Sequence, residues 1–305
     1  MKIMDKEFFE RESRALEMAL SSPLLFYTKD IASIKDDVDS MDQPVFSLTP
    51  HKNVRTYDMN ENTTVTIVPS GYGAATISDK DVWIYAISAI IHRLENGLPT
   101  SPNVLLCGSD FMRMTKRPLS GRYYDTLIRS LDRLTGTFVK MEFKKEDGKV
   151  KHSDTIAFPL ISGYKVVEDI FKDGRKNKFN IMIRIPPDIY AAVLQTRVLT
   201  IGEEYFHIKG MLERRVYELA RKHCGSQKEW KIKLENLQRK TGSLSDTRKF
   251  RFNINQIAKK NALPDYTLEM TKAVDGSDML VFRPRNQKKY WKKIAPEVVE
   301  TDDPF

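Results

Sequence analysis

Two stretches of the chain carry the same order of predicted elements: a short helix, a turn, a longer helix with a basic outer face, and a β-hairpin. In the first stretch Ser109 begins the short helix, and Ser120 begins a second helix over 121–134. Two alternating segments follow, 137–143 and 151–160, joined through an Asp-Gly turn that favours a hairpin. This order is typical of a helix-turn-helix followed by a wing, and it therefore predicts a winged helix.

The second stretch repeats the order at nearly the same spacing. In the first stretch the leading helix begins near Asp81 and the basic helix at Ser120, 39 residues later. In the second, the corresponding helices begin near Ile208 and Asp246, 38 residues apart. A second hairpin follows, with strands at 266–272 and 279–283 joined through another Asp-Gly turn. The pattern predicts a structural repeat.

These elements predict an α+β fold with two tandem winged-helix domains. The expected parts are an N-terminal extension at 1–45, a first domain at 46–195, a second domain at 196–290 and an acidic tail at 291–305. Within the extension we expect a short amphipathic helix over 5–20 and an exposed acidic segment at 34–39.

Charge is spread unevenly along the 305 residues, whose net charge is +9. The first hundred residues carry a net −5, the second hundred +7, residues 201–295 +11, and the last ten −4. Such asymmetry favours a polyanion as the partner of the middle and C-terminal regions. A solvated basic surface without a ligand is the alternative.

Composition also excludes several classes of protein. The longest apolar run, Val82 to Ile91, is half the length of a membrane-spanning helix, so no membrane partner is expected. Acidic residues stand where a signal peptide would need an apolar stretch. Cys107 and Cys224 lie 117 residues apart and form no CxxC pair, which argues against a disulfide framework or a Cys-rich zinc site. We therefore expect a cytoplasmic protein without metal or cofactor.

No enzyme motif is visible. A rolling-circle nickase would need a His-x-His pair, which the five histidines do not form, and Tyr124 of the Tyr123-Tyr124 pair falls on an apolar helix face. Gly71-Tyr72-Gly73 is not followed by the Gly-Lys-Ser/Thr of a phosphate-binding loop. We predict a protein that acts by binding, with no catalytic residues.

The second basic helix offers the strongest candidates for DNA contact. Arginine pairs with guanine, and Asn or Gln with adenine, through two hydrogen bonds in the major groove, while lysines suit phosphates. The candidate residues of this helix are Arg248, Lys249, Arg251, Asn255, Gln256, Lys259 and Lys260, and those at the end of the second hairpin are Arg283 and Arg285. A charged solvated face is the alternative.

The first basic helix and its hairpin offer weaker candidates. They are Arg122, Thr126, Arg129 and Arg133 on the helix and Lys144, Lys145 and Lys149 at the hairpin tip. Arg129 could instead pair with Asp125 or Asp132 along the helix, and lysines at a hairpin tip are often only solubilising.

Segments in the second half of the chain carry a family resemblance. The helix 209–222, with Arg-Arg-Val-Tyr-Glu-Leu-Ala-Arg-Lys at its centre, resembles the leading helix of the second winged helix in plasmid replication initiators. Residues 250–258 and 261–266 resemble the recognition helix and following strand of that domain. Over roughly 40–285 the chain is similar to replication initiator protein A, an iteron-binding family.

The resemblance implies a function. Such initiators bind direct repeats (iterons) in duplex origin DNA, help to open the origin, and recruit host proteins such as the replicative helicase and the host initiator. Many form a homodimer in equilibrium with the monomer and repress their own gene. A transcriptional repressor without a replication role, and a protein-interaction module with an incidental basic face, are the rival interpretations.

The dimer interface is expected in the first domain, whose N-terminal half is acidic. Residues 63–68 are β-branched and predict a strand that could pair with a second chain if it lay at a sheet edge. Val65 and Ile67 are then the interface candidates. The alternative is an internal strand that completes the first core.

Overall fold

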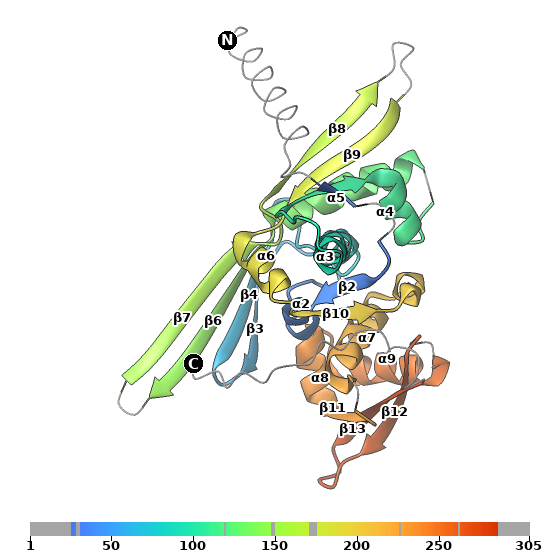
Figure 1. Ribbon diagram of the computed structural model, residues 1–305. Coiled ribbons are helices and arrows are strands. Elements are labelled where there is room, and N and C mark those ends of the chain that lie inside the picture. The colour runs from blue at the N-terminus through green and yellow to red at the C-terminus, as the bar shows by residue number, and fades with distance from the viewer. Residues whose placement is uncertain are drawn as a thin grey trace.

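The computed structural model describes residues 26–28, 31–118, 120–147, 150–170, 176–225, 227–261 and 263–285. They form a mixed α/β protein in which a larger first module packs on a smaller second module (Figure 1). We call residues 45–195 the first module, residues 203–285 the second module, and residues 34–42 the junction segment. The predicted helix at 5–20 and the acidic tail at 291–305 lie outside the described residues, and the predicted domain boundaries remain predictions.

The first module is built around helix α3 (Lys80–Glu95), which Figure 1 shows nearly end-on. Its apolar run Val82–Ile91 is buried on every side, as expected for a helix enclosed by other elements. Before it, the Asp79 carboxylate accepts the backbone N–H of Thr76 at 2.8 Å, which fixes the entering turn. Gly97, at a φ of +65°, follows the last turn and ends the helix.

One sheet of the first module contains the predicted hairpin. Its strands run in the order β3 (Arg55–Asn60), β4 (Thr63–Val68), β6 (Phe138–Asp147) and β7 (Val150–Pro159), each antiparallel to its neighbour. The edge position on which the dimer interface depended is not found, because β3 and β6 pair with β4 on both sides, and the alternative of an internal strand is confirmed. Val65 and Ile67 are fully buried in the first core and cannot form the expected dimer interface in this fold.

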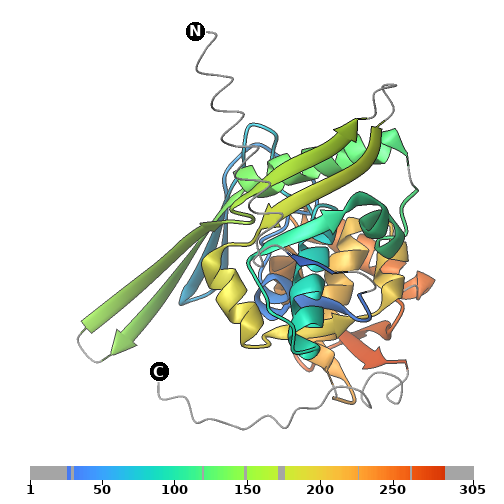
Figure 2. The same ribbon diagram turned by 45° about the horizontal axis from the view of Figure 1, so that its top comes forward.

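A second sheet and three helices complete the first module. The sheet has the order β1 (Phe26–Tyr27), β5 (Asn103–Cys107), β9 (Lys176–Arg184) and β8 (Gly163–Ile170). The helices are α4 (Gly108–Met114), α5 (Gly121–Gly136) and α6 (Pro187–Leu194). Helix α5 lies along β8 (Figure 2), where the Tyr164 hydroxyl donates to Asp132 at 2.6 Å. The predicted short and long helices around Pro118 are confirmed as α4 and α5.

The junction segment differs most from its prediction. Its strand β2 (Ile34–Asp37) pairs with β10 (Val198–Ile201), and helix α2 (Val38–Asp42) follows at once. The prediction that the acidic segment 34–39 is exposed is wrong, since all four residues of β2 are buried. Asp37 begins α2 by accepting the N–H of Ser40 at 2.7 Å. Asp36 of this segment is instead the partner of a buried cation, described below. Asp37 accepts the indole N–H of Trp83 at 2.6 Å, and Asp39 pairs with Arg197 at 2.8 Å.

The second module follows the predicted order. A 3-10 turn, η1 (Glu203–His207), leads into α7 (Met211–Cys224), β11 (Trp230–Lys233), α8 (Leu234–Thr241), α9 (Thr247–Lys260), β12 (Tyr266–Lys272) and β13 (Asp278–Pro284). The three strands form one antiparallel sheet with β13 in the centre. The predicted short helix, basic helix and hairpin are confirmed here. None of the helices in the described part of the chain has both the length and the apolar character needed to cross a membrane.

Candidate nucleic-acid interface

Helix α9 presents one apolar face to the core and one polar face to solvent. Phe250, Ile254 and Ile257 are buried, as their helical spacing predicts. Asp246 caps the helix by accepting the N–H of Lys249 at 2.8 Å. Gly242, at a φ of +69°, ends α8 and turns the chain toward α9. These local rules fix which side of α9 faces outward.

The outward side of α9 carries most of the residues that were predicted on this helix to contact DNA. Arg248, Lys249, Lys259 and Lys260 are exposed, and Asn255 and Gln256 are half-buried with their side chains on the same side. We call this set the α9 face: Arg248, Lys249, Phe252, Asn255, Gln256, Lys259 and Lys260. Donors and acceptors for base edges therefore lie between lysines placed for phosphates.

Three predicted arginines are already engaged within the second module. Arg251 pairs with Asp278 of β13 at 3.0 Å. Arg283 bridges Glu229 at 3.2 Å and Glu269 at 2.7 Å. Arg285 donates to Asn261 and to the carbonyl of Leu263, so that it closes the C-terminal end of α9. Arg285 has a structural role at this helix end, and the other two would have to exchange partners to contact DNA.

In the first module the candidates divide in the same way. Arg122, Thr126 and Arg129 are exposed on α5. Arg133 turns inward, where it donates two hydrogen bonds to the buried Asp79, at 2.5 and 2.8 Å. That pairing raises the pKa of the Arg133 guanidinium above its usual value, chiefly through the hydrogen bonds to Asp79. Its assignment to the DNA-contacting face is wrong for this fold, because its polar atoms are used to hold α5 against the start of α3.

The hairpin tip of the first module is only partly described. Lys144 is exposed, and its backbone N–H bonds the carbonyl of Asn62 at 2.8 Å. The side chain of Lys145, and Lys149 altogether, lie outside the described residues. The proposed tip contact therefore stays a prediction.

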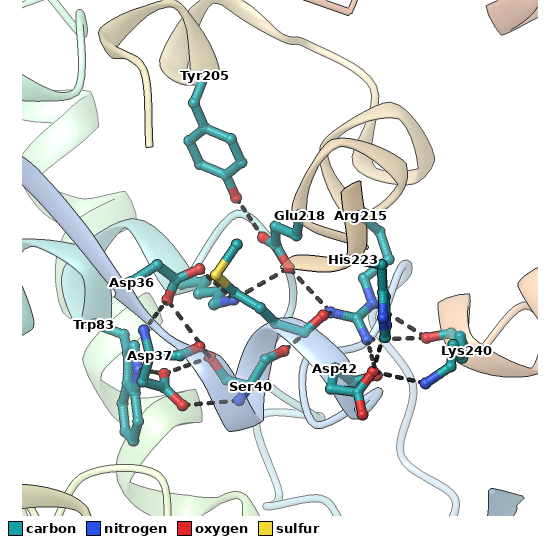
Figure 3. A network of polar contacts seen from close by, with 12 residues as sticks. Asp36, Asp37, Ser40, Asp42, Trp83, Tyr205, Arg215, Glu218, His223 and Lys240 are labelled. Atoms are coloured by element: carbon teal, nitrogen blue, oxygen red, sulfur yellow. Dashed lines mark hydrogen bonds and ion pairs between the residues drawn. The ribbon is translucent and has the colours of Figure 1, made fainter. Parts of the chain in front are cut away.

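A second concentration of charge lies between the two modules and is almost wholly buried (Figure 3). Lys80 of α3 forms ion pairs with Asp36 of the junction segment at 2.7 Å and with Glu218 of α7 at 3.1 Å. None of these three side chains is exposed to solvent. Tyr205 donates to Glu218 at 2.7 Å. The Lys80 ammonium thus joins the first module to both the junction segment and the second module.

Arg215 extends this network to the C-terminal end of the junction segment. Its guanidinium donates to the carbonyls of Ser40, Met41 and Asp42 at 2.9 to 3.0 Å and pairs with Glu218 at 3.1 Å. These bonds satisfy carbonyls at the end of α2 that the helix itself leaves free. We call Asp36, Lys80, Arg215 and Glu218 the junction network.

A second buried ion pair joins the leading helices α3 and α7 directly. Asp81 of α3 accepts from Arg214 of α7 at 2.7 Å and also pairs with Arg117, which follows α4. Burial raises the pKa of Asp81 above its usual value, although both arginines oppose that shift. The two residues that begin α3 are therefore both bound to α7.

Two of the four aspartates in the junction segment, Asp36 and Asp42, lie in opposite environments. Burial raises the pKa of Asp36 to about 7, against the attraction of Lys80. Burial also acts on Asp42, but hydrogen bonds from His223, Lys240 and Lys222 outweigh it and lower its pKa well below the usual range. In the folded chain, ionisation of Asp36 is therefore less favourable than in water, whereas ionisation of Asp42 is more favourable.

Comparison with known proteins decides the family. The family described as replication initiator protein A matches residues 35–268. A curated protein of Wigglesworthia glossinidia brevipalpis, described as "Putative replication protein", is 35% identical over 273 residues, which are 88% of this chain and 94% of the relative. This chain belongs to the replication initiator protein A family. The resemblance found in the sequence is confirmed, and with it the coarse role of a replication initiator.

Solved structures agree on the fold of the initiator. A crystal structure of selenomethionine derivatives of domains 2 and 3 of RctB covers 81% of this chain and 98% of its own length, at 11% identity and a TM-score of 0.60. A second crystal structure of RctB domains 2–3 covers 81% and 96% respectively, at 13% identity and a TM-score of 0.54. At these identities the likeness concerns the fold alone.

The family match also includes the residues that sequence reasoning missed. It begins at Lys35, inside the junction segment, and so takes in Asp36, Lys80 and Glu218. One signal was present in the sequence: Lys80 is the single cation among the acids Asp79 and Asp81 in the first turn of an otherwise apolar helix. A cation at a helix N-terminus opposes the helix dipole, so its placement there called for nearby carboxylates.

Proposed function

We propose that this initiator binds repeated sites in the duplex DNA of a plasmid origin, with helix α9 in the major groove as the base-reading helix. The observation that carries the proposal is the α9 face, where Asn255 and Gln256 lie between exposed cations on the side opposite the core. Amide side chains can make paired hydrogen bonds to adenine, and the lysines can neutralise phosphates. Helices α8 and α9 with the hairpin β12–β13 then act as a winged helix.

The first module takes a supporting part in this proposal. Helices α4 and α5 and the hairpin β6–β7 have the order of a second winged helix, and Arg122, Thr126 and Arg129 are exposed on α5. Two linked modules raise each other's effective concentration on DNA. The second module alone should therefore bind, but more weakly than the whole chain.

The initiator acts in this proposal by binding energy and DNA deformation, without a catalytic step. The opened origin then receives host proteins such as the replicative helicase and the host initiator. Binding at a related site near the gene would repress its transcription. A homodimer stays part of the proposal, but β4 is not its interface. Strand β7 is an outer strand of its sheet, with residues 153–157 exposed, and is the better candidate for pairing.

Fluorescence anisotropy with a duplex carrying the repeats found beside the gene tests the α9 assignment. Asn255→Ala should cost about 1–3 kcal/mol of binding free energy on that duplex and relax base preference, because a base contact is lost. Lys259→Ala should weaken binding to all sequences alike and reduce the slope of log K against log salt by about 0.9. Lys228→Ala, an exposed lysine outside the α9 face, is the control. Unchanged affinity and base preference in Asn255→Ala would refute the assignment.

A replication assay separates an initiator at this origin from a repressor. A plasmid carrying only the repeats and the adjacent A+T-rich segment should replicate when the wild-type chain is supplied and fail with Asn255→Ala. Site-specific binding without any dependence of replication on the chain would support the repressor instead.

A further inference from the structure

One large apolar side chain stands in the middle of the α9 face. Phe252 is 61% exposed, whereas Phe250, two residues earlier, is fully buried. At 100° per residue, Phe252 lies almost diametrically opposite the midpoint of Phe250 and Ile254. The Phe252 ring therefore points away from the core, toward the side of α9 that we propose binds DNA.

The neighbours of Phe252 define the chemistry of that partner. Arg248 lies one turn before it, and Asn255 and Gln256 lie one turn after it, followed by Lys259. Helix α9 contains no acidic residue from Thr247 to Lys260, its N-cap is Asp246, and Asp278 of β13 is paired with Arg251 and Lys272. A surface with cations around a phenyl ring suits a polyanion that offers an apolar group between its charges.

Duplex DNA offers one such group in the major groove, the 5-methyl of thymine. We propose that Phe252 contacts this methyl and so favours thymine at one or two positions of each bound repeat. The inference rests on the proposed function and adds a specificity-determining residue to it. Asn255 and Gln256 supply hydrogen bonds to adenine edges, and Phe252 supplies the apolar contact that hydrogen bonding cannot.

Replacing thymine by deoxyuridine tests this contact, because it removes the methyl and leaves base pairing intact. A binding site is first selected from a randomised duplex pool with the full chain, and each thymine is then replaced singly by deoxyuridine. The wild type should lose about three- to fivefold in affinity at one or two positions, the value expected for one buried methyl. Phe252→Ala should bind the thymine duplex about tenfold more weakly and be nearly indifferent to the same replacements.

Two further variants sharpen the result. Phe252→Leu keeps an apolar side chain and should keep part of the sensitivity to the methyl. Tyr72→Ala removes another exposed aromatic, 68% exposed and placed in the first module, and should keep the full sensitivity. Since Phe252 makes no core contact, its variants should unfold at the same urea concentration as the wild type.

The outcomes separate this inference from the proposed function. Site-specific binding that is unaffected by every deoxyuridine replacement, or affected equally in Phe252→Ala, overturns the methyl contact and leaves the DNA-binding role intact. A Phe252→Ala chain that binds DNA normally but self-associates less assigns the ring to a protein contact and also overturns it. Failure of the selection to enrich any sequence would instead contradict the proposed function.

Discussion

The junction network and the α9 face both contain lysine and arginine, and they use these cations in opposite ways. In the junction network, Lys80 and Arg215 are fully buried, and each is bound by carboxylates or carbonyls from other parts of the chain. On the α9 face, Arg248 and Lys259 remain in solvent. The cations of the junction network hold the modules together, and those of the α9 face stay available for a ligand.

Solvation explains the difference. A buried charge loses its water and must be compensated by the protein, so the junction network is satisfied only when α3, α7 and the junction segment meet in one arrangement. An exposed charge keeps its water and can exchange it for phosphate with little penalty, which releases counterions from DNA. Net charge by region therefore predicts a polyanion partner but not which cations meet it.

The largest effect on stability is expected at Lys80. Lys80→Met leaves Asp36 and Glu218 buried without their shared cation, which should lower the free energy of unfolding by about 3–5 kcal/mol. Lys116→Met is the control, since Lys116 pairs with Glu203 in solvent and should cost less than about 1 kcal/mol. Urea unfolding measures both. Equal losses in the two variants would remove the distinction between buried and exposed charge on which the comparison rests.

Arg133 and Arg129 carry the same comparison into a single helix. Arg133→Ala leaves the Asp79 carboxylate buried with its main partner gone, and should cost about 2–3 kcal/mol of stability. Arg129→Ala, on the exposed side of α5, should leave stability within about 0.5 kcal/mol of the wild type and weaken DNA binding instead. Thermal unfolding and anisotropy on both variants check this, and a destabilised Arg129→Ala would contradict it.

The sequence predicted best where local patterns decide the structure. In the second module, the capping Asp246, the apolar spacing of α9 and the Asp-Gly turn each act within a few residues, and the elements formed as expected. The junction segment depends on partners far along the chain: Ile34 pairs with Ile201, and Asp36 with Lys80. Short acidic segments are usually exposed, and nothing in residues 34–39 themselves shows the buried cation that they meet.

The same reasoning explains the outcome for the candidate contacts. Helical spacing places Arg133 and Arg129 near one another on α5. It does not show that Asp79, 54 residues before Arg133, binds Arg133 and not Arg129. Likewise β-branched residues predicted β4, while its place inside the sheet depends on β3 and β6. Element type follows from local sequence, whereas exposure follows from the long-range packing.

Asp36 and Asp42 of the junction segment give the comparison a pH dependence. With a pKa near 7 when folded and 3.8 as its ordinary value, Asp36 holds a proton between pH 4 and 7 that the unfolded chain has released. Stability should therefore fall as pH rises through this window, by up to about 1.4 kcal/mol per pH unit from this group. The charges of Lys80, Glu218 and Asp37 act on the Asp36 carboxylate: Lys80 lowers its pKa, and the two carboxylates raise it.

Asp36→Asn should flatten that part of the profile relative to the wild type, as measured by urea unfolding from pH 4 to 8. Asp42→Asn is the matched control with the opposite sign. The folded pKa of Asp42 is lowered, so its contribution is present above pH 3.8 and is lost only as pH falls further. A wild-type profile that rises relative to Asp36→Asn between pH 5 and 7 would contradict the assigned direction.

The smallest effect is expected at Arg251, which stands between the two behaviours. It lies on α9 but pairs with Asp278 of the hairpin. Because the Arg251 side chain is 47% exposed, Arg251→Ala should cost less than about 1 kcal/mol of stability. If Arg251 exchanges Asp278 for DNA on binding, Asp278→Asn frees the guanidinium and removes a nearby negative charge, and affinity for DNA should rise.

Anisotropy in matched salt compares the two variants. A loss of affinity in Arg251→Ala together with a gain in Asp278→Asn would place Arg251 on the α9 face. Unchanged affinity in both would make it a strut between α9 and β13, and only Arg248 would then remain as the arginine of that face.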